Sequence, residues 1–231
     1  MKRVLAVMAG LIVTSAASGH FVFIVPDGPG SGAGKVIFSD ALKPDERVNI
    51  EKLAGTKLFV LVPGGPDTEL KWTLNKDGAC YKVEVPGTGP RVVGATTDYG
   101  VLQRGDSKPF RLYYYAKAVF GDLPSPEKAT FGKRMPLELV PLAEAGKLRF
   151  QVLAQGQPLA KADVSVISPG SEKAESVTTD EKGITPPFEK TGRYGAHVQQ
   201  TEGKTGEDRG KKYEEVRHYA TAVLYFEKSG K

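Results

Sequence analysis

The sequence has 231 residues, of which 40% are hydrophobic and 26% are charged, and its formal net charge is +5. Lys2 and Arg3 account for two of these charges, and the +3 that remains is too mild and too evenly spread to indicate nucleic-acid binding. The 27 glycines and 16 prolines interrupt most stretches that would be long enough for a helix. Cys80 is the single cysteine, which excludes an internal disulfide, and we expect it to be a small side chain packed on a strand.

The first nineteen residues have the pattern of a signal peptide. Lys2-Arg3 form a basic start, Val4 to Val13 form an apolar run, and Ala17-Ser18-Gly19 place small side chains before a cleavage point. The apolar run is too short to cross a bilayer, which takes roughly 20 residues, and no later segment approaches that length. The sequence therefore predicts cleavage after Gly19, a periplasmic or secreted mature chain that begins at His20, and no membrane span in that chain.

Short strand-like stretches separated by turn clusters fill the chain up to about residue 140. They are Phe21 to Val25, Lys35 to Ser39, Lys57 to Val62, Glu69 to Leu74, Ala79 to Val85, Arg91 to Thr97 and Phe110 to Tyr115. Pro44 to Leu53 is the one fair candidate for a short helical turn. Residues 121–136 are rich in Pro, Lys and Glu, which favours a surface crossover or an interdomain connection.

A second unit begins near Gly146. Lys147 to Ala154 alternates apolar and polar side chains, and further strands are expected at Ala162 to Ile167, Ser176 to Thr179, Gly192 to Gln200 and His218 to Phe226. The sequence thus predicts an all-β fold of two small antiparallel β-sandwich domains of immunoglobulin-like or transthyretin-like type. The signal peptide would occupy residues 1–19, and the two domains would occupy residues 20–140 and 146–231.

The chain has only three histidines, and His20 would become the mature N-terminus. A terminal histidine offers its α-amine and its imidazole, so one residue can bind a metal through two nitrogens. Nitrogen-rich sites of this type suit Cu(II) and Ni(II). The α-amine has a pKa near 8, so a metal can displace its proton at neutral pH. Cleavage at a neighbouring position would remove this chelate.

His197 and His218 flank the polar stretch Gln199 to Val216, which would join two antiparallel strands. If Val198 faces Arg217, the two histidines lie directly opposite each other with Cβ atoms roughly 4.5 to 5.5 Å apart. Two imidazoles can then reach one ion at about 2.0 to 2.1 Å per bond. A shift of one residue would place them on opposite faces, and the sequence does not fix the register. The alternative is that all three histidines are ordinary strand-end side chains.

Two resemblances follow from longer stretches of sequence. The stretches "LRFQVLAQGQPLAKADVSVISPG" and "VTTDEKGITPPFEKTGRYGAHV" resemble the transthyretin-like or carboxypeptidase-regulatory-like sandwich. The start at residues 20–26, the segment Thr97 to Gly105 and the ending at Glu215 to Ala220 are similar to the exported family of unknown function called DUF4198. Some members of that family are labelled periplasmic nickel or cobalt uptake components, so the resemblance implies an extracytoplasmic role with a metal.

These observations favour a metal-binding protein over two alternatives. The leading hypothesis is a non-enzymatic carrier or sensor of a copper or nickel ion, with His20, His197 and His218 as ligands. The second is a non-catalytic envelope module that binds an envelope protein or a polysaccharide without a metal. The third is a copper-dependent oxidative enzyme. The sequence contains no Gly-x-Ser-x-Gly or His-Glu-x-x-His motif, and Gly28 to Lys35 lacks the spacing of a phosphate-binding loop.

Overall fold

The computed structural model describes residues 19–228, and this part of the chain is nearly all β, as predicted. The predicted signal peptide lies outside the described residues except for Gly19. Among the described residues, no helix is long and apolar enough to span a membrane. Their helical content is three short 3-10 helices, η1 (Ile50–Leu53), η2 (Pro126–Lys128) and η3 (Gly132–Arg134). The helical turn predicted between residues 44 and 53 is therefore confirmed for its last four residues.

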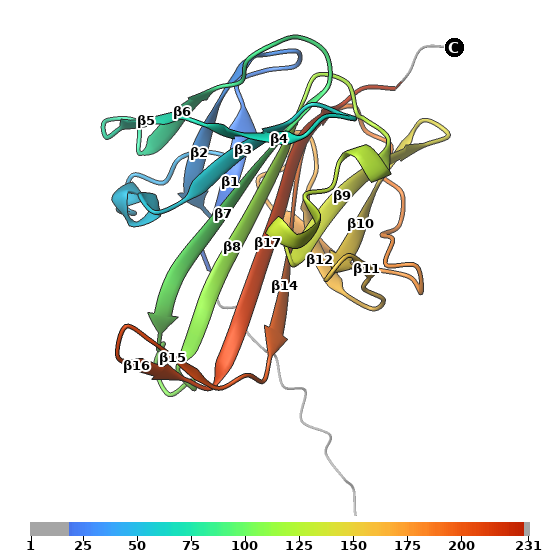
Figure 1. Ribbon diagram of the computed structural model, residues 1–231. Coiled ribbons are helices and arrows are strands. Elements are labelled where there is room, and N and C mark those ends of the chain that lie inside the picture. The colour runs from blue at the N-terminus through green and yellow to red at the C-terminus, as the bar shows by residue number, and fades with distance from the viewer. Residues whose placement is uncertain (1–18, 229–231) are drawn as a thin grey trace, which may run out of the picture.

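A long central sheet runs diagonally through the molecule (Figure 1). Its strands are, in spatial order, β13 (Ala174–Thr178), β12 (Asp163–Ile167), β14 (Gly192–Glu202), β17 (Glu215–Phe226), β8 (Phe110–Phe120), β7 (Arg91–Leu102), β3 (Lys57–Leu61) and β4 (Asp67–Leu70). Both predicted segments, 20–140 and 146–231, contribute four strands to it. They meet where β17 pairs with β8, from Glu215 opposite Phe110 to Val223 opposite Ala118. This junction is parallel, whereas the other pairs of the sheet are antiparallel.

Smaller sheets pack against the two faces of the central sheet. One has the order β1 (Phe21–Pro26), β2 (Ala33–Ser39), β6 (Cys80–Glu84) and β5 (Trp72–Asn75), and another has the order β11 (Gln157–Pro158), β10 (Lys147–Ala154) and β9 (Leu137–Glu144). Successive side chains of β17 point into different cores. Val223 packs in the core beneath β1 and β2, while Ala222 and Leu224 pack in the core beneath β9 and β10. The period-two alternation of the strand thus builds two apolar layers around one sheet.

Three predicted features of the chain differ in the structure. The stretch 69–74 divides between β4 in the central sheet and β5 in the four-stranded sheet. The strand β9 is not among the predicted strands. It contains Pro141, which a strand can accommodate at a sheet edge, and β9 lies at the edge of its three-stranded sheet. The connection at residues 121–136 is not confined to the surface. Its apolar side chains Ala129, Phe131 and Met135 are buried in the core beneath β9 and β10. Cys80, in contrast, is buried on β6 as expected.

A buried ion pair joins the central sheet to the sheet of β9. The Lys117 ammonium donates hydrogen bonds to Glu138 Oε1 and to the carbonyl of Ala129, each at 2.7 Å. The amide of Phe131 also donates to Glu138 Oε1, at 2.8 Å. Both charged side chains are almost completely inaccessible to solvent, and burial lowers the pKa of Lys117. The loss of either partner would therefore leave the other charge buried and unpaired, which is costly.

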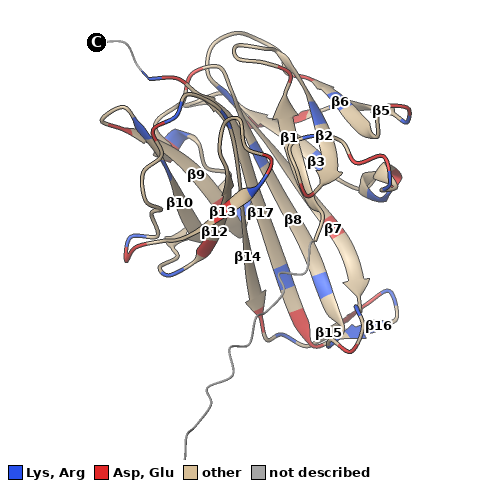
Figure 2. Cartoon of the chain, turned by 180° about the vertical axis from the view of Figure 1, so that it is seen from behind, with Lys and Arg blue, Asp and Glu red and all other residues tan. Residues whose placement is uncertain are grey.

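The lower end of the central sheet carries a second polar network. Arg111 on β8 pairs with Asp98 on β7 and with Asp208 on β15 (Gly206–Asp208), which forms a hairpin with β16 (Lys211–Tyr213). Figure 2 shows acidic and basic segments interspersed at these strand ends. The network ties the small hairpin to the body of the sheet.

Candidate functional site

His20 lies directly before β1, at the point where the described chain enters the four-stranded sheet. The hydroxyl of Tyr114, on the central sheet, donates a hydrogen bond to the carbonyl of His20 at 3.1 Å. The imidazole also packs against the ring of Phe38, with 5.6 Å between centroids. Its side chain nevertheless keeps 32% of its surface exposed. The backbone of this residue is therefore held in place while one side of its ring remains accessible.

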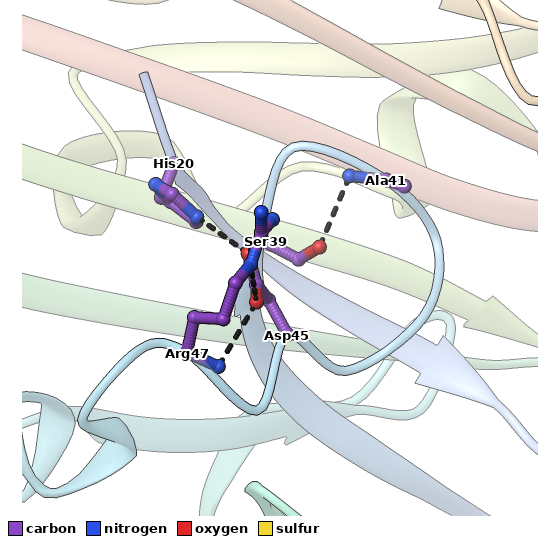
Figure 3. Close-up of polar contacts among 5 residues, drawn as sticks. All are labelled: His20, Ser39, Ala41, Asp45 and Arg47. Carbon is purple, nitrogen blue, oxygen red and sulfur yellow. Dashed lines mark hydrogen bonds and ion pairs between the residues drawn. The ribbon is translucent and has the colours of Figure 1, made fainter. Parts of the chain in front are cut away.

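Asp45 makes the polar contact that orients the His20 ring (Figure 3). It lies in the loop between β2 and η1, and its Oδ2 is 2.9 Å from His20 Nε2. Arg47 clamps the same carboxylate through Nε on Oδ1 at 2.9 Å and Nη2 on Oδ2 at 2.8 Å, and the Arg47 amide donates to Oδ1 at 3.0 Å. The hydrogen bonds from Arg47, and then that from His20, hold the pKa of Asp45 well below its usual range. Asp45 is therefore ionised at neutral pH.

An ionised carboxylate only accepts hydrogen bonds, so Nε2 of His20 must be the donor. A neutral imidazole has one N–H, and its second nitrogen, Nδ1, then carries the free lone pair. No hydrogen bond to Nδ1 is found within residues 19–228. Asp45 thus selects the tautomer in which Nδ1, the ring nitrogen nearer the backbone, can bind an electrophile.

His197 lies on β14 and faces the four-stranded sheet. Its ring stacks on that of Phe21 at 4.0 Å between centroids, and its cross-strand partner on β17 is Thr221. Burial lowers the pKa of His197 to about 4. The imidazole is therefore neutral at pH 7 and packs next to the residue that follows His20.

His218 lies on β17 and contacts tyrosines of β8. The Tyr115 hydroxyl is 3.0 Å from its Nδ1, and the rings of Tyr113 and Tyr115 stack near it at 5.7 and 5.8 Å. Nε2 is buried and has no hydrogen-bond partner among residues 19–228, and Glu202 Oε1 lies 3.5 Å from it. Burial lowers the pKa of His218.

The strand register separates His197 from His218. Val198 pairs with Ala220 rather than with Arg217, so His197 lies opposite Thr221 and His218 opposite Gln200. This register differs by three residues from the one that would align the histidines, and an odd shift places them on opposite faces of the sheet. The condition for a His197–His218 pair is therefore not met. Over residues 19–228, no group of three or more His, Cys, Asp or Glu side chains is arranged to hold a metal ion.

The sequence points to His20 as a candidate ligand but gives no sign of Asp45. The carboxylate lies 25 residues further along the chain, in a Pro44-Asp45 turn whose composition indicates only a loop. Its role depends on the pairing of β1 with β2, which carries the loop back to the start of β1. No local pattern signals that contact.

Comparison with known proteins gives one informative match. Two solved structures share low similarity with the chain. A two-domain fibronectin type-III segment of chicken tenascin is 11% identical with a TM-score of 0.23, over 87% of this chain and 97% of that one. A GBS pullulanase in complex with maltotetraose is 10% identical with a TM-score of 0.18, over 83% of this chain and 22% of that one. Similarities this low carry no argument about function.

No curated protein matches the sequence. The model of one family, however, matches residues 17–202, which is more than half of the chain. The chain belongs to the family DUF4198, a domain of unknown function.

Proposed function

We propose that this protein is an extracytoplasmic metal-binding protein, a carrier or sensor of a copper or nickel ion that uses His20 as its mature N-terminus. The α-amine and Nδ1 of His20 would bind the ion together and close a six-membered chelate ring. The observation that carries the proposal is the hydrogen bond from His20 Nε2 to the ionised Asp45, because it leaves Nδ1 free.

The Asp45 contact has the form expected around a metal-binding histidine. Such histidines almost always donate their second ring N–H to a carboxylate, a carbonyl or water, which fixes the tautomer and raises the basicity of the ligating nitrogen. Arg47 holds the carboxylate in place, and the Tyr114 hydroxyl holds the backbone of His20. The chelating nitrogens would therefore be oriented before an ion arrives.

The other two histidines contribute less to this proposal. His197 lies on the same side of the central sheet as β1, whereas His218 lies on the opposite side. We therefore assign the anchoring role to His20 and do not require the three rings to converge. The nickel or cobalt label of some DUF4198 members favours the same class of function.

Metal analysis of the exported mature protein tests the proposal. We expect one equivalent of Cu(II) or Ni(II) per chain to bind in calorimetry, and we expect His20→Ala to abolish that binding. Zn(II) should bind more weakly, in line with the affinity order of divalent metals. A mature protein that takes up neither Cu(II) nor Ni(II) would favour the envelope-binding module, and oxidation of a polysaccharide by the copper form with a reductant would favour the enzyme.

A further inference from the structure

A pocket of about 390 Å³ lies beside the loop that carries Asp45. One wall is Ala41 to Lys43, at the start of that loop, and the opposite wall is the turn from Ser168 to Glu172 between β12 and β13. Arg193 of β14 and Tyr225 of β17 also line it. These two residues are directly paired across the strands, so their side chains lie on the same face of the sheet. The volume is within the range of sites for small molecules.

Two glycines of β14 allow the walls of this pocket to pack close to the sheet. A Cβ atom at Gly195 would lie 2.6 Å from Leu42 Cδ2, so the absence of a side chain lets the loop pack directly on β14. A Cβ atom at Gly192 would likewise lie 2.9 Å from Pro169 Cβ. The pocket is therefore bounded by segments in direct contact with the sheet and is formed before a ligand binds.

Arg193 gives the pocket an uncompensated positive charge. Within residues 19–228, its guanidinium has neither a hydrogen bond nor an ion pair, in contrast to Arg47 and Arg111, which pair with aspartates. The other cation of the pocket, Lys43, is paired at the exposed rim with Glu172 at 3.0 Å. One positive charge thus remains, next to the Tyr225 phenol, for which no partner is found in the described part of the chain.

We propose that this pocket binds a small organic carboxylate. The planar guanidinium of Arg193 matches a carboxylate with two parallel hydrogen bonds, and Tyr225 supplies a hydroxyl for a polar group next to the carboxylate. A single unpaired cation favours an anion that presents one carboxylate to it. This site does not depend on a metal at His20, although the loop between β2 and η1 carries both the pocket wall and Asp45.

Calorimetry on the metal-free mature protein tests this site with acetate, L-lactate, D-glucuronate and citrate. D-glucose serves as the neutral counterpart of glucuronate. We expect at least one of the four anions to bind with a Kd below about 10 mM and glucose not to bind. Arg193→Gln should weaken that binding at least about tenfold, because it removes a charged hydrogen-bond pair. Tyr225→Phe should weaken it less.

Two controls make the outcome specific. Arg209→Gln removes a highly exposed guanidinium from the hairpin of β15 and β16 and should leave carboxylate binding unchanged. His20→Ala should also leave it unchanged, which separates this site from the metal proposal. The inference is overturned if none of the four anions binds, if glucose binds as well as glucuronate, or if Arg193→Gln binds like the unaltered protein.

Discussion

Asp45 selects the tautomer of the neutral His20 ring although it contributes no atom to the proposed chelate. Its side chain is only 8% exposed and accepts hydrogen bonds from both His20 and Arg47. We predict that Asp45→Ala lowers the affinity for Cu(II) about 10- to 100-fold while one equivalent still binds, because the ring loses its fixed orientation. Competition titration with a chelator measures this change.

The matched control for Asp45 is Asp27→Ala. Asp27 also pairs with a cation, Lys35 at 3.3 Å, but this pair is exposed and has no contact with His20. The affinity of the Asp27→Ala variant for Cu(II) should equal that of the unaltered chain. Equal losses in the two variants would mean that overall charge, and not the orientation of His20, determines the affinity.

The lowered pKa of His197 should make the protein less stable at acidic pH. Burial lowers its pKa from 6.5 to about 4, so the unfolded chain takes up a proton at a higher pH than the folded chain does. Stability is therefore unaffected by this group above pH 6.5 and falls as the pH decreases from 6.5 to 4, by about 2 kcal/mol at pH 5.

Urea unfolding at pH 7.5 and pH 5 measures this loss. His197→Gln should reduce the difference in unfolding free energy between the two pH values by about 2 kcal/mol. The variant also loses the stacking on Phe21, which lowers stability at both pH values and so does not enter the difference. An unchanged difference would show that His197 is protonated equally in the folded and unfolded chains.

The connection at residues 121–136 packs closely on β7, and this close packing depends on Gly94. A Cβ atom there would lie 2.6 Å from Met135 Cε and 2.7 Å from the ring of Phe131. We predict that Gly94→Ala destabilises the protein by about 1 to 3 kcal/mol through overpacking. Gly55→Ala is the control, since no atom lies within 4 Å of a Cβ built at that position. Chemical denaturation should show Gly55→Ala to be neutral or slightly stabilised, and equal effects would exclude steric overlap as the cause.

The strands themselves were largely predictable, since alternation and turn residues are local signals. The register of β14 and β17 was not, because the segment between them is longer than a tight turn and contains the β15–β16 hairpin. The polar residues Gln199 to Glu202 look like a loop but continue β14, paired with Val216 to Tyr219. That continuation separates His197 from His218. The contact between His20 and Asp45 could not be predicted from local sequence either. It forms because the pairing of β1 with β2 brings the loop after β2 next to His20.

At the scale of the whole molecule, one sheet joins the two segments expected to form separate sandwiches. The parallel pairing of β8 with β17 brings together residues 110–118 and 215–223, and no local sequence signal announces so distant a contact. Both cores also include side chains of β17 and residues from the first segment. The two halves should therefore stabilise each other.

We predict that residues 20–231 unfold in a single cooperative transition. Trp72 is the only tryptophan, it lies on β5 in the first segment, and it stacks on Tyr81 at 3.9 Å, so its fluorescence reports on that segment. Far-ultraviolet circular dichroism reports on all strands. The two curves should coincide in urea, as expected for a two-state transition. Two separated transitions would show that the halves fold independently despite their shared sheet.

In the proposed site the α-amine and the ring of His20 act as one chelate, and moving the N-terminus separates the two nitrogens. Cu(II) affinity is measured by calorimetry for a chain that begins at His20 and for one that begins at Ser15, which keeps every histidine but places the free amine five residues away. We expect the first chain to bind one equivalent tightly and the second to bind with an affinity at least about 100-fold lower, since one of two chelating nitrogens is lost. Equal affinities would contradict the proposed chelate.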